Sequence, residues 1–191
     1  MNRPAETEFL EFFRELDALL PLEKPSCKAT LYLFGGAVSV IAYGSRRATL
    51  DIDAYIEDRA LRGKLLKWAG SGSELEKRHG LYLHAANTEL MLLETPEWKE
   101  RSVQILCGKL RNIRLMAISP EDLVLSKLSR YNDRDREDIR FLITKHRLKA
   151  GKLIGYYKSA RKYFVGDLCA LDLTFNIILK EYFGLQAHKF D

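Results

Sequence analysis

Apolar residues near the start of the chain recur at steps of three and four positions. This period predicts an amphipathic helix, because residues three and four apart lie on one face of a helix. Pro21 and Pro25 end that helix and open a loop. The residues of the predicted apolar face are Phe9, Phe12, Phe13, Leu16, Leu19 and Leu20.

Short apolar runs separated by turn signals follow, and they predict a small sheet with helices beside it. The run at 30–34 predicts a strand, which is followed by Gly35-Gly36 and a short buried helix over 37–43. A second strand, predicted over 50–56, is interrupted by two carboxylates. The other predicted elements are a helix over 61–69, strands over 81–84 and 89–93, and a hairpin that pairs 103–106 with 113–116.

From Ser119 onward the pattern is helical only. Ser119 and Pro120 are typical of the N-cap and the first position of a helix. We therefore expect an α+β fold, with a small mixed sheet and flanking helices followed by a C-terminal helical bundle. The predicted domains are 1–118 and 119–191. Helices are predicted over 120–130, 134–146, 151–162 and 168–183.

The composition is that of a globular protein. The 191 residues are 47% hydrophobic and 30% charged, which argues against disorder. No apolar run approaches the roughly 18 residues of a membrane span, and the segment up to Glu15 lacks the basic region and cleavage site of a secretory signal. Because the three cysteines are far apart, a disulfide framework or a Cys-rich zinc site is not expected. These features predict a cytoplasmic protein with no membrane partner.

Charge is unevenly distributed along the chain. The total is 31 Lys+Arg against 26 Asp+Glu, or +5. Residues 1–100 carry 13 Lys/Arg and 16 Asp/Glu, a balance of −3, whereas residues 101–191 carry 18 and 10, a balance of +8. This asymmetry favours a polyanionic partner for the C-terminal part. A helical domain with solvated Lys and Arg faces explains it equally well.

The pattern that indicates chemistry lies between residues 33 and 53. Asp51 and Asp53 are two apart on a predicted strand, so their side chains share one face. Two such carboxylates repel each other, and a divalent cation removes the repulsion. Their oxygen ligands suit Mg²⁺ or Mn²⁺, which bind through one or two carboxylates plus substrate phosphates. The diglycine can hold phosphate on its backbone N–H groups, and Ser45, Arg46 and Arg47 can contact phosphate as well.

Each part of this pattern also has a purely structural interpretation. A diglycine after a strand is, alone, more often a tight turn, and an Asp-x-Asp at a sheet edge can simply face solvent. The tandem order of strand, diglycine, helix, loop and Asp-x-Asp favours function. The four histidines show no metal-ligand spacing, and we interpret them as structural or surface residues: His79, His84, His146 and His188.

The same segment resembles the active-site signature of the DNA polymerase β-like nucleotidyltransferase superfamily. Within it, the sequence is most similar to minimal bacterial nucleotidyltransferases that include the AbiEii-type toxins. Their pattern of Gly-Gly, apolar helix and Arg-x-Thr/Ser-x-Asp-x-Asp appears as Gly35-Gly36, Arg47-Ala-Thr49 and Asp51-Ile-Asp53. The resemblance continues through a strand that leads into a helix bearing Lys127, and through the stretch 130–139. It covers roughly residues 30–145.

The resemblance implies a role for each matching residue. Asp51 and Asp53 would hold Mg²⁺ or Mn²⁺ on a nucleoside triphosphate, and Lys127 would neutralise phosphate charge. The implied reaction is the attack of an acceptor hydroxyl on the α-phosphate, with pyrophosphate leaving. The acceptor would be a nucleic acid, with transfer RNA as one choice, or a protein. The implied nucleotide-binding residues are Gly35, Gly36, Ser45, Arg46, Arg47, Thr49, Asp135 and Asp138.

One departure from the superfamily leaves two other hypotheses open. Many members carry a third carboxylate on a later strand; Glu89 and Glu94 lie in the right region, but each is better interpreted as an exposed residue. The enzyme hypothesis includes a toxin–antitoxin or phage-defence role with a cognate antitoxin protein as partner. The second hypothesis is a catalytically weak member that acts as a binding or regulatory partner. The third is a basic helical module that binds nucleic acid, for which the helices show no recognition layout.

Overall fold

The computed structural model describes residues 6–20, 29–46, 48–85 and 97–190. The chain divides into two compact units. The first comprises the described parts of Met1–Ala86 together with Ser102–Ile118, and the second comprises those of Asn87–Arg101 together with Ser119–Asp191. The division into domains 1–118 and 119–191 stays a prediction. No helix among these residues is long and apolar enough to cross a membrane.

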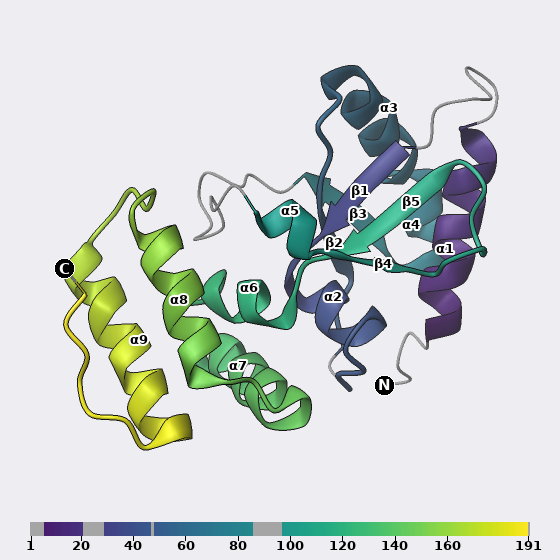
Figure 1. Ribbon diagram of the computed structural model, residues 1–191. Helices are drawn as coiled ribbons and strands as arrows, with labels where there is room; N and C mark the ends of the chain where they lie inside the picture. The colour runs from purple at the N-terminus through teal and green to yellow at the C-terminus, as the bar shows by residue number, and fades with distance from the viewer. Residues whose placement is uncertain (1–5, 21–28, 47, 86–96, 191) are drawn as a thin grey trace. The chain divides into compact units, whose positions relative to one another are not determined.

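The first unit is built on a five-stranded mixed sheet with the order β3-β2-β1-β5-β4 (Figure 1). Its centre is β1, which pairs antiparallel with β2 and parallel with β5. β3 is parallel to β2, and β4 is antiparallel to β5, as expected for the hairpin. The strands are β1 (Ala29–Leu33), β2 (Asp51–Tyr55), β3 (Tyr82–Ala85), β4 (Val103–Ile105) and β5 (Ile113–Ala117).

Helices cover this sheet and supply most of the large side chains of its core. The predicted apolar face of α1 is confirmed, because Phe9, Phe12, Phe13 and Leu16 are fully buried. Burying a Phe or Leu side chain contributes about 1.5–3 kcal/mol each. In Figure 1, α1 runs alongside the strands, and it contacts the other three helices of the unit. The helices are α1 (Glu6–Leu19), α2 (Gly35–Ile41), α3 (Arg59–Ala69) and α4 (Glu74–His79).

A buried carboxylate ties α1 to the loop that enters β5. Asp17 is 7% exposed, and its side chain accepts hydrogen bonds from the backbone N–H groups of 111, 112 and 113 at 2.9, 2.8 and 2.7 Å. Asn112 returns a side-chain hydrogen bond to the carbonyl oxygen of Asp17. These bonds hold the loop that enters β5 against the end of α1.

The second unit is helical, as predicted. It contains a buried aromatic cluster, in which Tyr157 stacks on Phe175 with ring centroids 4.0 Å apart and Phe190 packs against both. The Tyr157 hydroxyl donates to Asp172 Oδ1 at 2.6 Å, and burial together with this bond raises the pKa of Tyr157 well above its ordinary value. The helices are α5 (Trp98–Arg101), α6 (Pro120–Leu125), α7 (Asp133–His146), α8 (Ala150–Arg161) and α9 (Leu168–Phe183).

Three local predictions need correction. The diglycine is not a loop before α2, because Gly35 and Gly36 are the first residues of that helix. The helix expected over 120–130 ends at Leu125, so Lys127 lies in the turn that follows it. There the backbone shifts to tighter i to i−3 bonds, with Lys127 N donating to Val124 O at 3.2 Å. The short helices α4 and α5 have no counterpart in the predicted elements. The strand expected over 89–93 lies outside the described residues.

Candidate active site

Asp51 and Asp53 lie on one face of β2, as the spacing predicts. Along the strand the buried residues alternate with the two carboxylates, and Ile52 and Ala54 point into the core. Asp51 is exposed, and the Asp53 side chain is 22% exposed. The apolar face of β2 is buried, so both carboxylates must face away from the core.

The backbone at Gly35 lies directly against Asp53. Gly35 has φ +64, in the left-handed region that favours glycine. A Cβ atom at this position would stand 2.4 Å from Asp53 Oδ2, so a side chain there has no room. The backbone N–H of Phe34 also donates to Asp53 O at 2.9 Å. The strand-to-helix turn and the second carboxylate are therefore in contact, although 17 residues lie between Gly35 and Asp53 in the sequence.

The loop between α2 and β2 places Thr49 beside the first carboxylate. Thr49 is 6% exposed, and its hydroxyl donates to Asp51 Oδ1 at 2.6 Å. Earlier in this loop, Ser45 N donates to Ser39 O at 2.8 Å, which closes the end of α2. The side chain of Arg46 is exposed to solvent, and Arg47 lies outside the described residues. The structure brings Thr49 to the carboxylate pair, while the expected contacts of Ser45 and Arg46 with phosphate stay predictions.

His84 is the residue at this site that sequence reasoning missed. It lies on β3 in register with Asp53, and its Nδ1 is 2.9 Å from Asp53 Oδ1. Its side chain is 65% exposed. The strand that carries His84 is predictable, but a single sequence does not reveal that β3 pairs with β2 in parallel and in this register. The pairing of β2 with β3 would have been needed to place His84 at the site.

The donor atoms of this face suit a hard divalent cation. Two carboxylates face outward from β2, and Asp53 Oδ2 occupies the space beside Gly35 that a Cβ would need. Across the described ranges, no three side chains of His, Cys, Asp or Glu converge closely enough to hold a metal ion by themselves. Mg²⁺ and Mn²⁺ do not require such a cluster, because substrate phosphates complete their coordination. The residues therefore fit the expected cation.

Lys127, Asp135 and Asp138 meet in the second unit. Lys127 Nζ is 3.3 Å from Asp135 Oδ1 and 2.7 Å from Asp138 Oδ2, and all three side chains are at most 4% exposed. Asn132 is the N-cap of α7 and its side-chain oxygen accepts a hydrogen bond from the Asp135 N–H at 3.0 Å. The helix begins there, and Asp135 and Asp138 lie on its buried face. Asp135 Oδ2 is buried with no hydrogen-bond partner among the residues that the structure describes. The roles expected for this triad toward a nucleotide stay predictions.

The other residues considered from the sequence fall into two groups. Glu89 and Glu94, the weaker choices for a third carboxylate, lie outside the described residues. Of the remaining histidines, His79 pairs with Glu15 at 3.0 Å and packs edge-on against Phe12, in agreement with a structural role.

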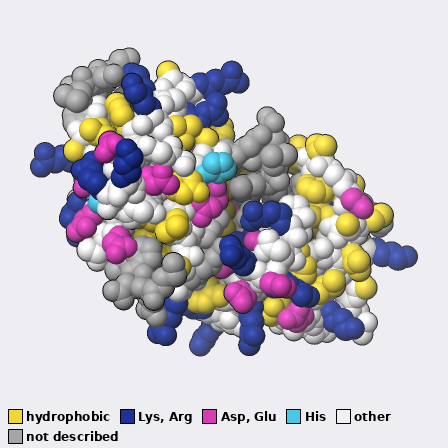
Figure 2. Space-filling model, turned by 180° about the vertical axis from the view of Figure 1, so that it is seen from behind, with side chains coloured by type: hydrophobic (Ala, Val, Ile, Leu, Met, Phe, Trp, Pro, Cys, Tyr) yellow, Lys and Arg dark blue, Asp and Glu magenta, His cyan; other side chains and the backbone are white. Residues whose placement is uncertain are grey.

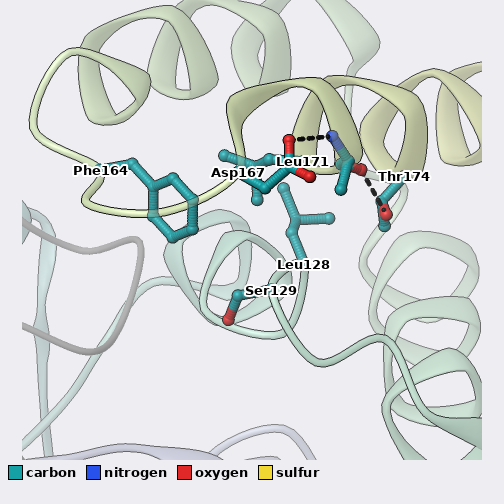
Figure 3. Close-up of a pocket in the computed structure, with 7 residues that line it drawn as sticks. Leu128, Ser129, Phe164, Asp167, Leu171 and Thr174 are labelled. Carbon is teal, nitrogen blue, oxygen red and sulfur yellow. Dashed lines mark hydrogen bonds between the residues drawn. The ribbon is translucent and has the colours of Figure 1, made fainter.

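A small pocket in the second unit contains none of the predicted site residues. Its volume is about 120 Å³, and it lies between the turn after α6 and the start of α9 (Figure 3). The polar side chains of α9 that line it bond to their own helix, with Asp167 accepting from Ala170 N and Thr174 donating to Ala170 O. We assign no chemistry to it.

Comparison with known families agrees with this geometry. A model of the family described as a nucleotidyltransferase of unknown function (DUF6036) matches residues 7–168. The chain belongs to this family. The match includes both the carboxylate pair of β2 and the triad of the second unit, so membership of this nucleotidyltransferase family extends well beyond the Asp-x-Asp motif. Comparisons with curated proteins and with solved structures gave no match.

Proposed function

We propose that the protein transfers a nucleoside monophosphate from a nucleoside triphosphate to a hydroxyl group of a nucleic acid or a protein. In this reaction the acceptor oxygen bonds to the α-phosphorus, the bond from that phosphorus to the pyrophosphate oxygen breaks, and the hydroxyl proton passes to solvent. The observation that carries the proposal is the contact between Gly35 and Asp53. The backbone turn at Gly35 can approach a phosphate group, and the carboxylate of Asp53 beside it can hold a cation.

In this reaction each residue of the candidate site has a proposed role. Asp51 and Asp53 hold Mg²⁺ or Mn²⁺, which neutralises phosphate charge as pyrophosphate leaves. Thr49 fixes one oxygen of Asp51 by hydrogen bonding, leaving the other free to turn to the cation. Gly35 and Gly36 let the triphosphate approach the backbone, and the exposed cation of Arg46 pairs with a phosphate oxygen.

The charge of the helical unit supports a polyanionic acceptor. On α7 the outward side chains include Arg134, Arg136, Arg140 and Lys145, all exposed. Figure 2 shows Lys and Arg side chains projecting from the surface among Asp and Glu. Such cations contact phosphates without reading sequence. We therefore favour an RNA acceptor such as transfer RNA. The resemblance to AbiEii-type toxins supports the further proposal that the protein is a toxin with a cognate antitoxin protein as partner.

A second candidate function is that of a binding or regulatory partner with weak catalysis. It is favoured by the lack, within the described ranges, of a third carboxylate beside Asp51 and Asp53. Without that group, an acceptor hydroxyl has no evident base next to the cation.

The test incubates the full chain with each α-labelled nucleoside triphosphate, Mg²⁺ or Mn²⁺, and total cellular RNA and protein. We expect label on one class of acceptor and loss of at least about a thousandfold of the rate in Asp53→Asn, since the cation contributes several kcal/mol of charge stabilisation. Glu74→Gln is the matched acid-to-amide control, because Glu74 pairs only with neighbours on α4 and is largely exposed. It should transfer label at the normal rate.

Two outcomes separate the candidate functions. Triphosphate binding by calorimetry without transfer to any acceptor would favour the weakly catalytic partner. If neither binding nor transfer occurs with any nucleotide and either cation, the nucleotidyltransferase proposal is wrong.

A further inference from the structure

We propose that two copies of the protein associate through the outer face of α9, the last helix of the second unit. This face contains none of the residues of the candidate site, so the inference is independent of the proposed function. The partner that it names is a second copy of the same chain.

The outer face of α9 is apolar over its first ten residues. The exposed positions there are Cys169, Ala170, Leu173 and Ile177, and Leu173 and Ile177 are 64% and 39% exposed. Cys169, Leu173 and Ile177 are four residues apart, so their side chains form one continuous row along the helix. We call these three residues the α9 ridge.

A comparison with α7 of the same unit shows that the ridge is not an ordinary solvent-facing surface. On α7 every exposed position is charged except Thr144. Between residues 169 and 179 the only charged residue of α9 is Asp172. Its carboxylate is 22% exposed and accepts hydrogen bonds from Arg161 and Tyr157 of the same unit. Helix faces that meet water are normally polar or charged, so the α9 ridge has the character of a buried face.

The C-terminal segment of the chain does not cover the ridge. After α9 this segment turns back and runs beside the helix (Figure 1). The Asn176 side chain donates to His188 O at 3.0 Å and accepts from the His188 N–H at 2.7 Å. Phe190 is buried against Tyr157 and Phe175. The segment is therefore anchored up to Phe190, and the ridge is exposed with the segment in place.

The charge of the face favours a second copy as its partner. A face without charged side chains offers nothing to pair with an acidic or basic partner, and another neutral apolar face complements it best. The exposed faces of α1, α3, α4, α7 and α8 all carry charged side chains. A second α9 supplies the neutral apolar face that these helices lack.

The spacing of the ridge also suits contact with itself. Rows of residues four apart interlock when two helices cross at about −50°, with axes about 8–10 Å apart. With a twofold axis at Leu173, the two Leu173 side chains meet, and Cys169 of each copy lies near Ile177 of the other. The helix ends diverge at this angle, so the exposed Lys180 and Glu181 stay in water. One helix pair covers less than the about 800 Å² per partner of a stable interface, so we expect a weak, reversible dimer.

The first test measures the mass of the full chain by sedimentation velocity, from low micromolar to near-millimolar protein. Wild type should shift reversibly from monomer to dimer as its concentration rises. Leu173→Lys puts two like charges on the twofold axis and should weaken the dimer at least about tenfold. Val103→Lys on β4 is the matched control, because Val103 is 57% exposed and lies outside the face; it should dimerise as wild type does. Urea unfolding should show that Leu173→Lys keeps the stability of wild type, since Leu173 is largely exposed.

The second test locates the axis by oxidative cross-linking, in a chain whose three native cysteines are replaced by serine. Leu173→Cys should form a disulfide between two copies, because residues on the axis come within the Cα separation of about 4.4–6.8 Å that a disulfide needs. Lys158→Cys, at an exposed position of α8, should cross-link much more slowly.

Three outcomes would overturn the proposal. A wild-type chain that stays monomeric at every concentration would leave the face to a different protein. A dimer that Leu173→Lys does not weaken would place the interface elsewhere on the molecule. Equal cross-linking rates at positions 173 and 158 would show random collision in place of a specific contact.

Discussion

Two groups of aspartates in this protein differ in how their charge is satisfied. Asp135 and Asp138 are buried on α7 around the ammonium group of Lys127. Asp51 and Asp53 face away from the core on β2, and their hydrogen-bond partners are a hydroxyl group and an imidazole. In the described part of the chain, no Lys or Arg forms an ion pair with either of them.

The burial of the group on α7 favours a structural role for it, and the proposed function assigns a binding role to the pair on β2. A buried carboxylate must be paired with a cation or hydrogen-bonded by the chain itself, because water cannot solvate it. A solvent-facing pair can leave its charge for a cation from outside. The comparison predicts that the fold depends less on the charge of the pair on β2 than on the charge of the buried group on α7. Unfolding experiments can test this.

Each unit contains one tryptophan, so the unfolding of each unit can be followed separately by fluorescence. The chain contains two tryptophans, Trp68 on α3 in the first unit and Trp98 on α5 in the second. Denaturation in a Trp98→Phe background reports on the first unit, and Trp68→Phe reports on the second. The following predictions use these backgrounds, from the largest expected effect to the smallest.

Replacing Lys127 by Met should have the largest effect on stability. It removes the ammonium group that both buried carboxylates share and leaves Asp135 with the largely exposed Arg130, and breaking a buried ion pair costs about 3–5 kcal/mol. Urea unfolding followed by Trp98 fluorescence should show this loss in the second unit. The control is Lys158→Met on α8 of the same unit, since Lys158 is exposed and its replacement should change stability little. Equal stability of Lys127→Met and wild type would mean that the triad is not structural.

Gly35→Ala should cost more than the same change at Gly80. The two glycines have nearly equal φ, +64 and +65, but only at Gly35 does an added Cβ meet Asp53 Oδ2. Left-handed backbone costs about 1–2 kcal/mol at either position, and overpacking adds about 1–3 kcal/mol at Gly35 alone. Trp68 fluorescence during urea unfolding measures both variants. Equal losses would show that the turn and the carboxylate are not in contact.

Asp17→Asn tests whether burial, rather than the unit a residue belongs to, decides the role of an aspartate. Asp17 lies in the first unit but is buried, and it accepts three backbone N–H bonds. An amide group places an N–H₂ against one of these donors, so we expect a loss of about 1–3 kcal/mol. The measurement is the unfolding midpoint in the Trp98→Phe background. No loss would contradict the rule drawn from the two pairs.

Asp51→Asn should have the smallest effect on folding. Asp51 is exposed and accepts a hydrogen bond that an Asn side-chain oxygen can also accept. The free energy of unfolding should therefore change by no more than about 0.5 kcal/mol, while Mn²⁺ binding measured by paramagnetic resonance falls sharply. A large loss of stability here would mean that the carboxylate is structural after all.

Much of the secondary structure is readable from local pattern, because that pattern reflects which face an element buries. The face of α1, the β2 strand and the Ser119 N-cap all follow from residue spacing and capping chemistry. The end of α6 was not readable, since the residues after Leu125 have good helix formers and no glycine. There Ser126 donates to Leu123 O at 2.8 Å and the backbone tightens, which a propensity argument does not detect.

The candidate site divides in the same way. The period of a strand is two, so the sequence by itself determined that Asp51 and Asp53 share a face. The motif around them predicted a nucleotidyltransferase family, which the family match confirms. Only the tertiary structure decided that Gly35 touches Asp53, that His84 lies opposite it, and that Lys127 is enclosed by two carboxylates. Spacing along a strand is a local property of the backbone, whereas register between strands and burial around a charge depend on residues far apart in the chain.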